Sequence, residues 1–305
     1  MSFRRSSVGV SSYATQSSAQ GYPSDVTFSW VFLFHRPANR NNIPALRGEG
    51  MKRFLVLLYG GVTYLIGLGT FIYAIGFVDG IGVSKTINAG PASSTRFALF
   101  IDTLLLTAFG IQHSGMARQA FKRWLTKGIS PSIERSTYVL CTSLLLILLF
   151  WQWRPIPQAI WNVSNTAASF ALIAISLLGW GLVLLSTFLI SHADLFGLKQ
   201  VMKYFQGERY EYPEFRTPSL YKLVRHPLYT GFLIAFWATP NMTAGHLLFS
   251  VATSGYIVIG TLLEERDLVT FHGQVYENYR RLVPMFFPTR AKVQETKKTR
   301  PARIS

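Results

Sequence analysis

Long apolar stretches separated by polar segments run through the chain from residue 54 onward. Phe54–Val78 contains no charged residue, and Asp102 is the only charge within Phe97–His113. Two further apolar stretches cover Ser136–Trp153 and Ala167–Ile190. Since about 20 apolar residues form a helix that crosses the hydrocarbon core of a bilayer, the pattern predicts one membrane-spanning helix over each of these four ranges.

A fifth apolar block, Leu228–Leu263, is long enough for two helices and is broken at Pro240 and Asn241. We expect it to form a helical hairpin whose first limb is short, as in a re-entrant segment. The predicted fold class is an all-α integral membrane protein with five to six transmembrane helices, which means six crossings or five crossings and a re-entrant limb.

The composition agrees with a membrane protein and argues against an ordinary soluble domain. The 305 residues are 49% hydrophobic and 14% charged, whereas soluble domains carry roughly a quarter charged residues. The 30 lysines and arginines exceed the 14 acidic residues, which gives a formal net charge of +16. A basic chain can bind nucleic acid, but the mean hydropathy of +0.25 is too high for a solvated basic domain.

The basic residues are distributed unevenly between the loops. Ranges 114–135 and 191–225 contain five and six lysines and arginines, whereas 79–96 and 154–166 contain two and one. Because positive residues collect on the cytoplasmic side of a membrane, the two basic loops and the basic tail are predicted to be cytoplasmic, with both termini inside. Most of the charge then reflects topology and contact with anionic lipids, and no nucleic-acid partner is expected.

The two ends of the chain differ from its middle. Residues 1–50 contain nine serines and no apolar stretch long enough to span a bilayer. This is typical of a disordered extension, of a targeting peptide or of upstream sequence placed before the true start. We favour the last interpretation because Met51, Lys52 and Arg53 directly precede the first apolar run. The predicted organisation is an extension over 1–50, a membrane domain over 51–290 and a basic cytoplasmic tail over 291–305.

Candidate chemistry begins where the hairpin begins, at Arg225, His226 and Pro227. Proline disfavours helix in the residue before it and is tolerated in the first helical turn, so His226 is expected at a helix N-terminus. Arginine and histidine beside a helix N-terminus can bind an anion. The alternative is a pair that serves only as an interfacial anchor.

Two adjacent carboxylates, Glu264 and Glu265, stand at the other end of the hairpin. They point about 100° apart on a helix, and a solvated helix end is the alternative explanation for them. The hairpin returns them to the same membrane face as Arg225 and His226. We therefore expect the C-terminal hairpin to form a cytoplasm-facing cofactor pocket flanked by these four residues.

Such a pocket suits a zwitterionic cofactor. Arginine can hold a carboxylate bidentately, and glutamate accepts hydrogen bonds from ribose hydroxyls. The rings of Tyr276 and Tyr279 would attract a cationic sulfonium. S-adenosyl-L-methionine carries all three groups.

These residues belong to a longer pattern that resembles the cofactor-binding half of the isoprenylcysteine carboxyl methyltransferase superfamily of membrane enzymes. The matching segments are Arg225–Gly231, Glu264-Glu265 with Leu268, Phe271–Gly273, Tyr276, Tyr279 and Val283–Pro288. The wider chain, roughly residues 51 to 290, is more closely similar to the bacterial methanethiol S-methyltransferases. The segments that carry this similarity are Gly110–Ser114, Glu134–Tyr138, Phe150–Pro155 and Leu189–Leu198.

The resemblance implies a protein of the bacterial inner membrane that methylates the small volatile thiol methanethiol with S-adenosylmethionine and releases dimethyl sulfide. It implies that the amino-acid end of the cofactor is held by Arg225, His226, Tyr229 and Gly231. The residues that would close the nucleoside side are Glu264, Glu265, Tyr276 and Tyr279. The chain departs from the superfamily pattern at His272, where a different residue often precedes the glycine.

Thiol activation supplies the candidates for direct catalysis. The thiolate is the reactive form of a thiol, so a nearby base would assist the transfer. His113, beside Gln112 and Ser114, and His192, two residues before Asp194, are the catalytic candidates. Packing or helix-end capping is the alternative role for each. No histidine pair has a recognisable metal-ligand spacing, so no metal is expected.

Other functions share parts of this pattern. The cofactor motif is also compatible with a different acceptor, such as an isoprenylcysteine carboxylate, a phospholipid amine or another thiol. Membrane sterol-type reductases resemble the superfamily in the C-terminal region and use a nicotinamide cofactor, although the chain has no glycine-rich dinucleotide fingerprint. NnrU-type membrane proteins share the general fold and represent a non-enzymatic alternative.

Overall fold

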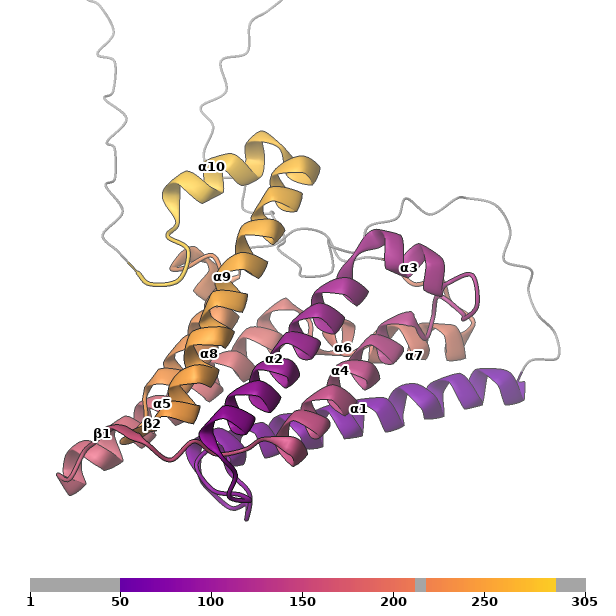
Figure 1. Ribbon diagram of the computed structural model, residues 1–305. Coiled ribbons are helices and arrows are strands. Elements are labelled where there is room, and N and C mark those ends of the chain that lie inside the picture. The colour runs from indigo at the N-terminus through magenta and orange to yellow at the C-terminus, as the bar shows by residue number, and fades with distance from the viewer. Residues whose placement is uncertain (1–49, 212–217, 289–305) are drawn as a thin grey trace, which may run out of the picture.

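The computed structural model describes residues 50–211 and 218–288 (Figure 1). Among these residues, five helices are long and apolar enough to cross a membrane: α1 (Gly50–Asp79), α2 (Thr95–Ala117), α4 (Glu134–Gln152), α5 (Thr166–Ile190) and α9 (Ala244–His272). The predictions for the N-terminal extension and for the basic tail lie outside the described residues. The all-α membrane fold expected from the apolar pattern is confirmed.

The short limb of the hairpin is α8 (Pro227–Trp237), which has 11 residues and is therefore only about 16 Å long. A strand, β2 (Asn241–Thr243), follows it and pairs antiparallel with β1 (Ala159–Asn162) from the α4–α5 connection. The Thr243 hydroxyl also donates to the side chain of Asn88 in the α1–α2 connection, at 2.7 Å. The far end of α8 is thus tied to the two loops that the charge pattern places outside the cytoplasm.

The second limb of the hairpin is longer than the apolar pattern predicts. The apolar block ends at Leu263, yet α9 continues to His272. The helix continues because Glu264, Glu265 and Leu268 remain on its buried face, so the first polar residues are part of the packing surface.

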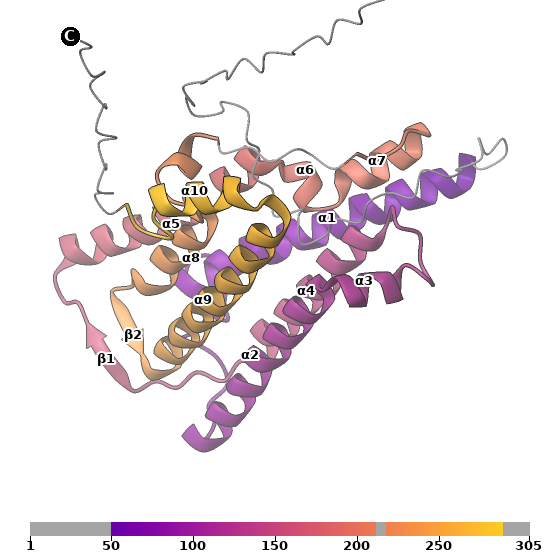
Figure 2. The same cartoon turned by 90° about the horizontal axis from the view of Figure 1, so that it is seen from above.

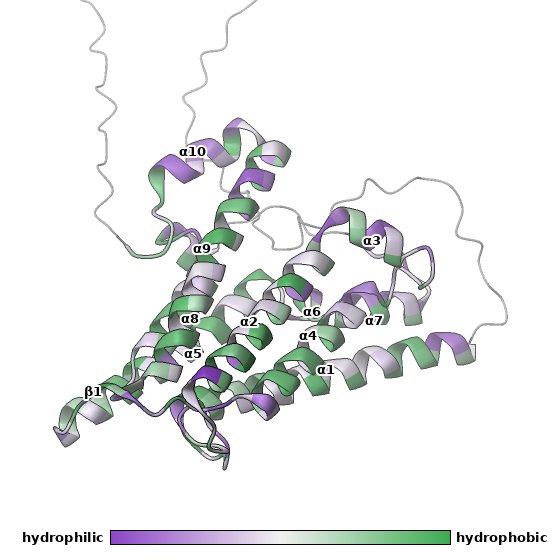
Figure 3. Ribbon diagram, viewed as in Figure 1, coloured by the Kyte–Doolittle hydropathy of each residue, from purple (hydrophilic) through white to green (hydrophobic). Residues whose placement is uncertain are grey.

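The helices form a bundle in which α9 lies between α8 and α2 (Figure 2). Short helices occupy the end of the bundle opposite the strands: α3 (Gln119–Leu125), α6 (His192–Leu195), α7 (Leu198–Gln206) and α10 (Gln274–Leu282), with a 3-10 turn at Ser219–Lys222. Hydrophilic residues gather on α3, α7 and α10, whereas the long helices are mainly hydrophobic (Figure 3).

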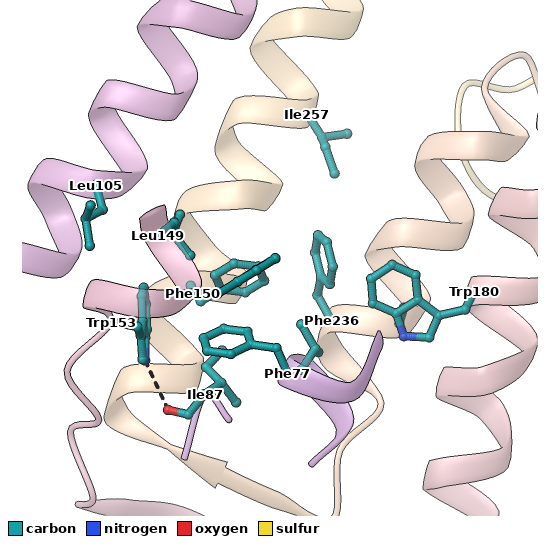
Figure 4. Packing of buried hydrophobic residues seen from close by; sticks show 12 residues of the cluster. Phe77, Ile87, Leu105, Leu149, Phe150, Trp153, Trp180, Phe236 and Ile257 are labelled. Carbon is teal, nitrogen blue, oxygen red and sulfur yellow. Dashed lines mark hydrogen bonds between the residues drawn. The ribbon is translucent and has the colours of Figure 1, made fainter. Parts of the chain in front are cut away.

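A cluster of buried aromatic residues packs the strand end of the bundle (Figure 4). The indole nitrogen of Trp153 donates to the carbonyl oxygen of Ile87 at 3.1 Å, and both residues are fully buried. Asp102 is also fully buried, and its Oδ1 accepts a hydrogen bond from the backbone nitrogen of Arg154 at 2.9 Å. An acidic residue inside a span requires a partner, and Oδ1 has one, whereas Oδ2 has no hydrogen-bond partner among the described residues.

Candidate active site

The ends of the hairpin meet in a buried ion pair. Arg225 and His226 directly precede α8, whose first residue is Pro227. The Nε atom of Arg225 donates to Oε1 of Glu265 at 2.6 Å, and Nε2 of His226 lies 3.0 Å from the same oxygen. The three side chains are 8%, 0% and 5% exposed. The hairpin therefore brings the basic pair and the acidic pair into direct contact.

His226 contacts the Glu265 carboxylate as a neutral ring. Burial lowers the pKa of His226 below its ordinary value of 6.5, since a charged imidazolium is poorly solvated inside a protein. A carboxylate oxygen accepts hydrogen bonds, so the neutral ring carries its proton on Nε2 and donates it to Glu265. The Arg225 guanidinium thus supplies the counter-charge for this carboxylate.

Arg225 also fastens the segment that follows α10 to the start of α8. Its Nη1 atom donates to the carbonyl oxygens of Arg280 and Val283 at 2.8 and 2.6 Å. Its backbone nitrogen donates to the carbonyl of Pro284, and the Thr230 hydroxyl donates to the carbonyl of Phe286 at 2.7 Å. The guanidinium is largely occupied by contacts within the protein, so it orders the surroundings of the glutamates.

Glu264 is buried like Glu265 but lacks comparable partners. Its side chain is 4% exposed, and Nδ1 of His226 lies 3.9 Å from its Oε2, beyond hydrogen-bond distance. Within the described residues, neither Oε2 of Glu264 nor the hydroxyl of Thr261, one helical turn earlier, has a hydrogen-bond partner. A buried acceptor without a donor is unfavourable. A ligand that brings an ammonium or hydroxyl group to Glu264 would satisfy this acceptor. S-adenosylmethionine carries both groups, so the residues of this site fit it.

Three tyrosines lie behind the glutamates. Tyr221, Tyr276 and Leu268 form a small buried cluster with Tyr279 packed against it. The Tyr279 hydroxyl donates to the carbonyl of Tyr221 at 2.6 Å, and the rings of Tyr276 and Tyr279 are 5.8 Å apart. Burial raises the pKa of Tyr276 and of Tyr279 above the ordinary value, so both remain neutral donors at physiological pH.

His113 belongs to a second polar cluster, between α2, α4 and α9. The Tyr138 hydroxyl lies 2.9 Å from Nε2 and 3.0 Å from Nδ1 of His113. Phe109 stacks on the imidazole with ring centroids 5.3 Å apart. The Tyr256 ring stands at the edge of this imidazole, and its hydroxyl is 3.0 Å from the Ser114 hydroxyl.

Tyr229 connects the two clusters. It lies on the first turn of α8, and its side chain is within electrostatic range of Glu264, Tyr256 and Tyr138. Its ring is 5.8 Å from that of His226. Tyr229 is therefore within reach of residues from both clusters, a relationship that the separate sequence motifs do not reveal.

His192 is the first residue of α6 and lies beside α1 and α5. Its Nδ1 is 2.9 Å from the Thr187 hydroxyl, and its Nε2 is 3.0 Å from the Tyr64 hydroxyl. Phe188 stacks on its ring at 4.4 Å. Both ring nitrogens are used in packing α6 against α1 and α5, and the ring also packs on Phe196 rather than on His113 or the glutamates.

Gly231, which the resemblance assigned to the cofactor, faces α5. A Cβ atom on Gly231 would lie 2.6 Å from the carbonyl oxygen of Gly179 and 2.9 Å from the backbone nitrogen of Val183. The residue therefore permits close packing of α8 on α5, which fixes the position of the residues that precede α8.

Sequence reasoning assigned no role to Tyr138, Tyr256 or Thr261. Tyr138 falls within one of the segments that carry the family resemblance, and this was the available signal for it. Tyr256 and Thr261 stand in an otherwise apolar helix, where a tyrosine or threonine is unremarkable by type alone. Among the described residues there is also no group of three or more histidine, cysteine, aspartate or glutamate residues that could hold a metal ion.

Comparison with known proteins finds several relatives that are about half identical to this chain and share one name. The chain is 50% identical over 250 residues to methanethiol S-methyltransferase 1 of Bradyrhizobium diazoefficiens, covering 82% of this chain and 88% of that protein. It is 53% identical to the methanethiol S-methyltransferase of a Pseudomonas species, over 77% of this chain and 90% of that protein. The corresponding protein of Mycobacterium tuberculosis is 50% identical, over 78% and 98%. No family model and no solved structure matches the chain.

Proposed function

The chain belongs to the methanethiol S-methyltransferase family, and we propose that it transfers the methyl group of S-adenosylmethionine to the sulfur of methanethiol, forming dimethyl sulfide. It is a methyltransferase with membrane-spanning helices. The identity of the methyl donor, the cytoplasmic position of the site and the bacterial inner membrane are parts of this proposal. The main support for S-adenosylmethionine as the methyl donor is the buried Glu264 side chain, whose Oε2 lacks a hydrogen-bond partner among the described residues and which neighbours the Arg225–Glu265 pair.

In this proposal the donor side is divided between binding and positioning residues. Glu264 accepts hydrogen bonds from the amine or the ribose hydroxyls of the cofactor. Tyr229, Tyr276 and Tyr279 lie around the cofactor. Arg225, His226 and Glu265 are positioning residues, because their mutual contacts hold the starts of α8 and of the Val283–Phe286 segment against α9. S-adenosylmethionine supplies an activated methyl group on a sulfonium, so the protein needs mainly to align the two sulfurs and to exclude water.

The acceptor side requires a base. A simple thiol titrates at or above the value of about 8.5 for free cysteine, so little thiolate exists at neutral pH. His113 would accept the thiol proton as the thiol sulfur takes up the methyl group, and S-adenosylmethionine would supply that methyl group and keep the electron pair of its carbon–sulfur bond as the departing thioether. Tyr138 orients the imidazole through its hydroxyl contact. His192 is assigned no part in this step, because its ring contacts Tyr64, Thr187 and Phe188 and neither glutamate.

The test is direct. Membranes that contain the protein are incubated with S-adenosylmethionine and methanethiol, and dimethyl sulfide is measured in the headspace. Product above that of membranes without the protein is expected, and its formation should depend on both reactants. If no product exceeds the empty-membrane background, the proposed function is wrong. An isoprenylcysteine, a phospholipid amine and a longer thiol, supplied in parallel, determine whether another acceptor is preferred.

A further inference from the structure

A glycine separates the two polar clusters on α9. Tyr256, Gly260 and Glu264 follow one another at intervals of four residues, so they lie within about 80° of one face of the helix. Tyr256 points to α2, where it contacts Phe109 and Ser114. Glu264 points to the buried site beside His226. Gly260 therefore lies on α9 between Tyr256, which faces the His113 cluster, and Glu264, which faces the proposed S-adenosylmethionine site.

The space beside Gly260 is open. A Cβ atom on Gly260 would meet no atom within 4 Å. Gly255, in the same helix, also has open space beside it, but it is exposed on the face of α9 that carries Val251, Ile259 and Leu262. Gly260 is only partly exposed, and Thr261 next to it is fully buried. The open space at Gly260 thus lies at the edge of the buried face of α9, whereas that at Gly255 lies on its exposed face.

The groups around this opening suit a small thiol near a methyl donor. The Tyr229 side chain interacts with both Tyr256 and Glu264, the residues one turn to either side of Gly260. The Tyr256 ring also packs at the edge of the His113 imidazole, with centroids 6.2 Å apart. A molecule seated against Gly260 would thus have the proposed base on one side and the donor site on the other.

The Tyr256 side chain faces α2 at its hydroxyl and along its ring. Its hydroxyl lies 3.0 Å from the Ser114 hydroxyl, and a Cβ atom on Gly110 would make ordinary van der Waals contact with the ring, at 3.5 Å. The ring therefore forms the α2 side of the opening.

Resting on the proposed function, we propose that the acceptor sulfur docks against Gly260 and that the Tyr256 ring limits the length of the alkyl group that the thiol carries. Gly260 and Tyr256 are then specificity-determining residues: the glycine leaves room for the sulfur, and the tyrosine closes the far side. The preferred acceptor class is a thiol with one or two carbon atoms.

The first experiment fills the opening. In Gly260→Leu, kcat/KM for methanethiol should fall at least tenfold, while the Kd for S-adenosylhomocysteine stays close to the wild-type value. Gly255→Leu is the matched control, because it adds the same side chain to the same helix on the outer face, and it should leave both quantities unchanged. Gly260→Ala, which favours helix over glycine, should give a smaller loss in the same direction if the leucine variant fails to fold.

The second experiment replaces the Tyr256 ring by a smaller side chain. Tyr256→Leu should raise the ratio of kcat/KM for propanethiol to that for methanethiol by tenfold or more, since one methylene group in an apolar pocket changes selectivity by about 10-fold to 200-fold. Tyr256→Phe, which keeps the ring, should retain the wild-type ratio.

The outcomes separate the two proposals. If the wild-type protein methylates no thiol, the proposed function is wrong and this inference falls with it. If the wild type is active but Gly260→Leu behaves like Gly255→Leu, or Tyr256→Leu keeps the wild-type selectivity, this inference alone is wrong. Loss of S-adenosylhomocysteine binding in Gly260→Leu would assign the opening to the donor and would also overturn it.

Discussion

Gly231 of α8 and Gly179 of α5 face each other so closely that a Cβ atom on Gly231 would lie 2.6 Å from the carbonyl oxygen of Gly179. Small residues permit this approach between membrane helices. Because the contact fixes the height and rotation of α8, it also fixes Arg225 and His226, which precede that helix. The packing of two helices thus determines where the buried ion pair stands.

A methyl group at this contact should destabilise the protein. We expect Gly231→Ala to reduce the free energy of unfolding by about 1–3 kcal/mol, the usual effect of overpacking, because backbone atoms of α5 cannot move aside as a side chain can. The midpoint of thermal unfolding in detergent measures this effect. Gly181→Ala is the control, since a Cβ atom on Gly181 meets nothing within 4 Å. Equal midpoints for the two variants would contradict the interpretation.

The two adjacent glutamates should respond differently to loss of charge. Glu264→Gln is expected to weaken S-adenosylhomocysteine binding about tenfold, the value of a hydrogen bond to a charged group, with little change in stability. Glu265→Gln should instead lower the free energy of unfolding by about 1.5–3 kcal/mol, because Arg225 would remain buried without a counter-charge.

Isothermal titration and thermal unfolding distinguish these effects. Asp267→Asn serves as the control, since Asp267 is a partly exposed carboxylate on the same helix. A stability loss in Glu264→Gln as large as that in Glu265→Gln would show that the two residues do not have separate roles.

His226 should make stability depend on pH. Burial lowers its folded-state pKa below the ordinary 6.5, so between these two values the unfolded chain binds more protons than the folded protein. Stability from this residue is therefore present above pH 6.5 and is lost as the pH falls below it. In His226→Gln the amide can still donate to Glu265 but does not titrate. The decline of the unfolding midpoint between pH 7 and 5 should be shallower in the variant, and parallel curves would refute this assignment.

The assignment of His113 as base predicts a pH-dependent defect. His113→Gln should lower kcat by about 10²-fold to 10⁴-fold at neutral pH, the usual contribution of general base catalysis. The defect should shrink as the pH approaches that at which the thiol ionises by itself. Dimethyl sulfide production measured from pH 6.5 to 9.5 gives both quantities. A defect of constant size across this range would indicate a structural role for His113.

His192→Gln examines the other histidine candidate. Activity should remain close to that of the wild type, because the Gln side chain can still contact the Thr187 or Tyr64 hydroxyl that His192 contacts. A loss comparable to that of His113→Gln would return His192 to the catalytic step.

The apolar pattern was sufficient to predict the membrane helices. The boundaries of α5, expected at Ala167–Ile190, differ from Thr166–Ile190 by one residue, because uninterrupted apolar sequence and membrane thickness determine such a helix almost alone. The pairing of β1 with β2 was not predicted. It joins Ala159 to Thr243, which are too far apart in the sequence for any local pattern to reveal.

The site was predictable in its members but not in their arrangement. The hairpin required Arg225 and Glu265 to lie at the same end of the bundle, whereas the sequence offers no means of telling which glutamate is paired with arginine. Adjacent residues on a helix differ by a rise of about 1.5 Å and a rotation of about 100°, and which of them faces Arg225 depends on the packing of α8 and α10 against α9. The same reason explains why His113 and His192, both flanked by polar residues, were equivalent candidates until the structure placed them apart.

The length of α9 has a consequence for how the reactants arrive. Glu264 is 20 residues along this helix from Ala244, which is about 30 Å and equals the hydrocarbon thickness of a bilayer. Gly260 and Tyr256 lie one and two turns deeper. In the proposed assignment, S-adenosylmethionine thus binds from the aqueous phase at the boundary of the hydrocarbon. The uncharged thiol reaches the site from within the hydrocarbon. Partitioning of the thiol into hydrocarbon would then set the substrate concentration that the enzyme experiences, and dimethyl sulfide would be released into the membrane.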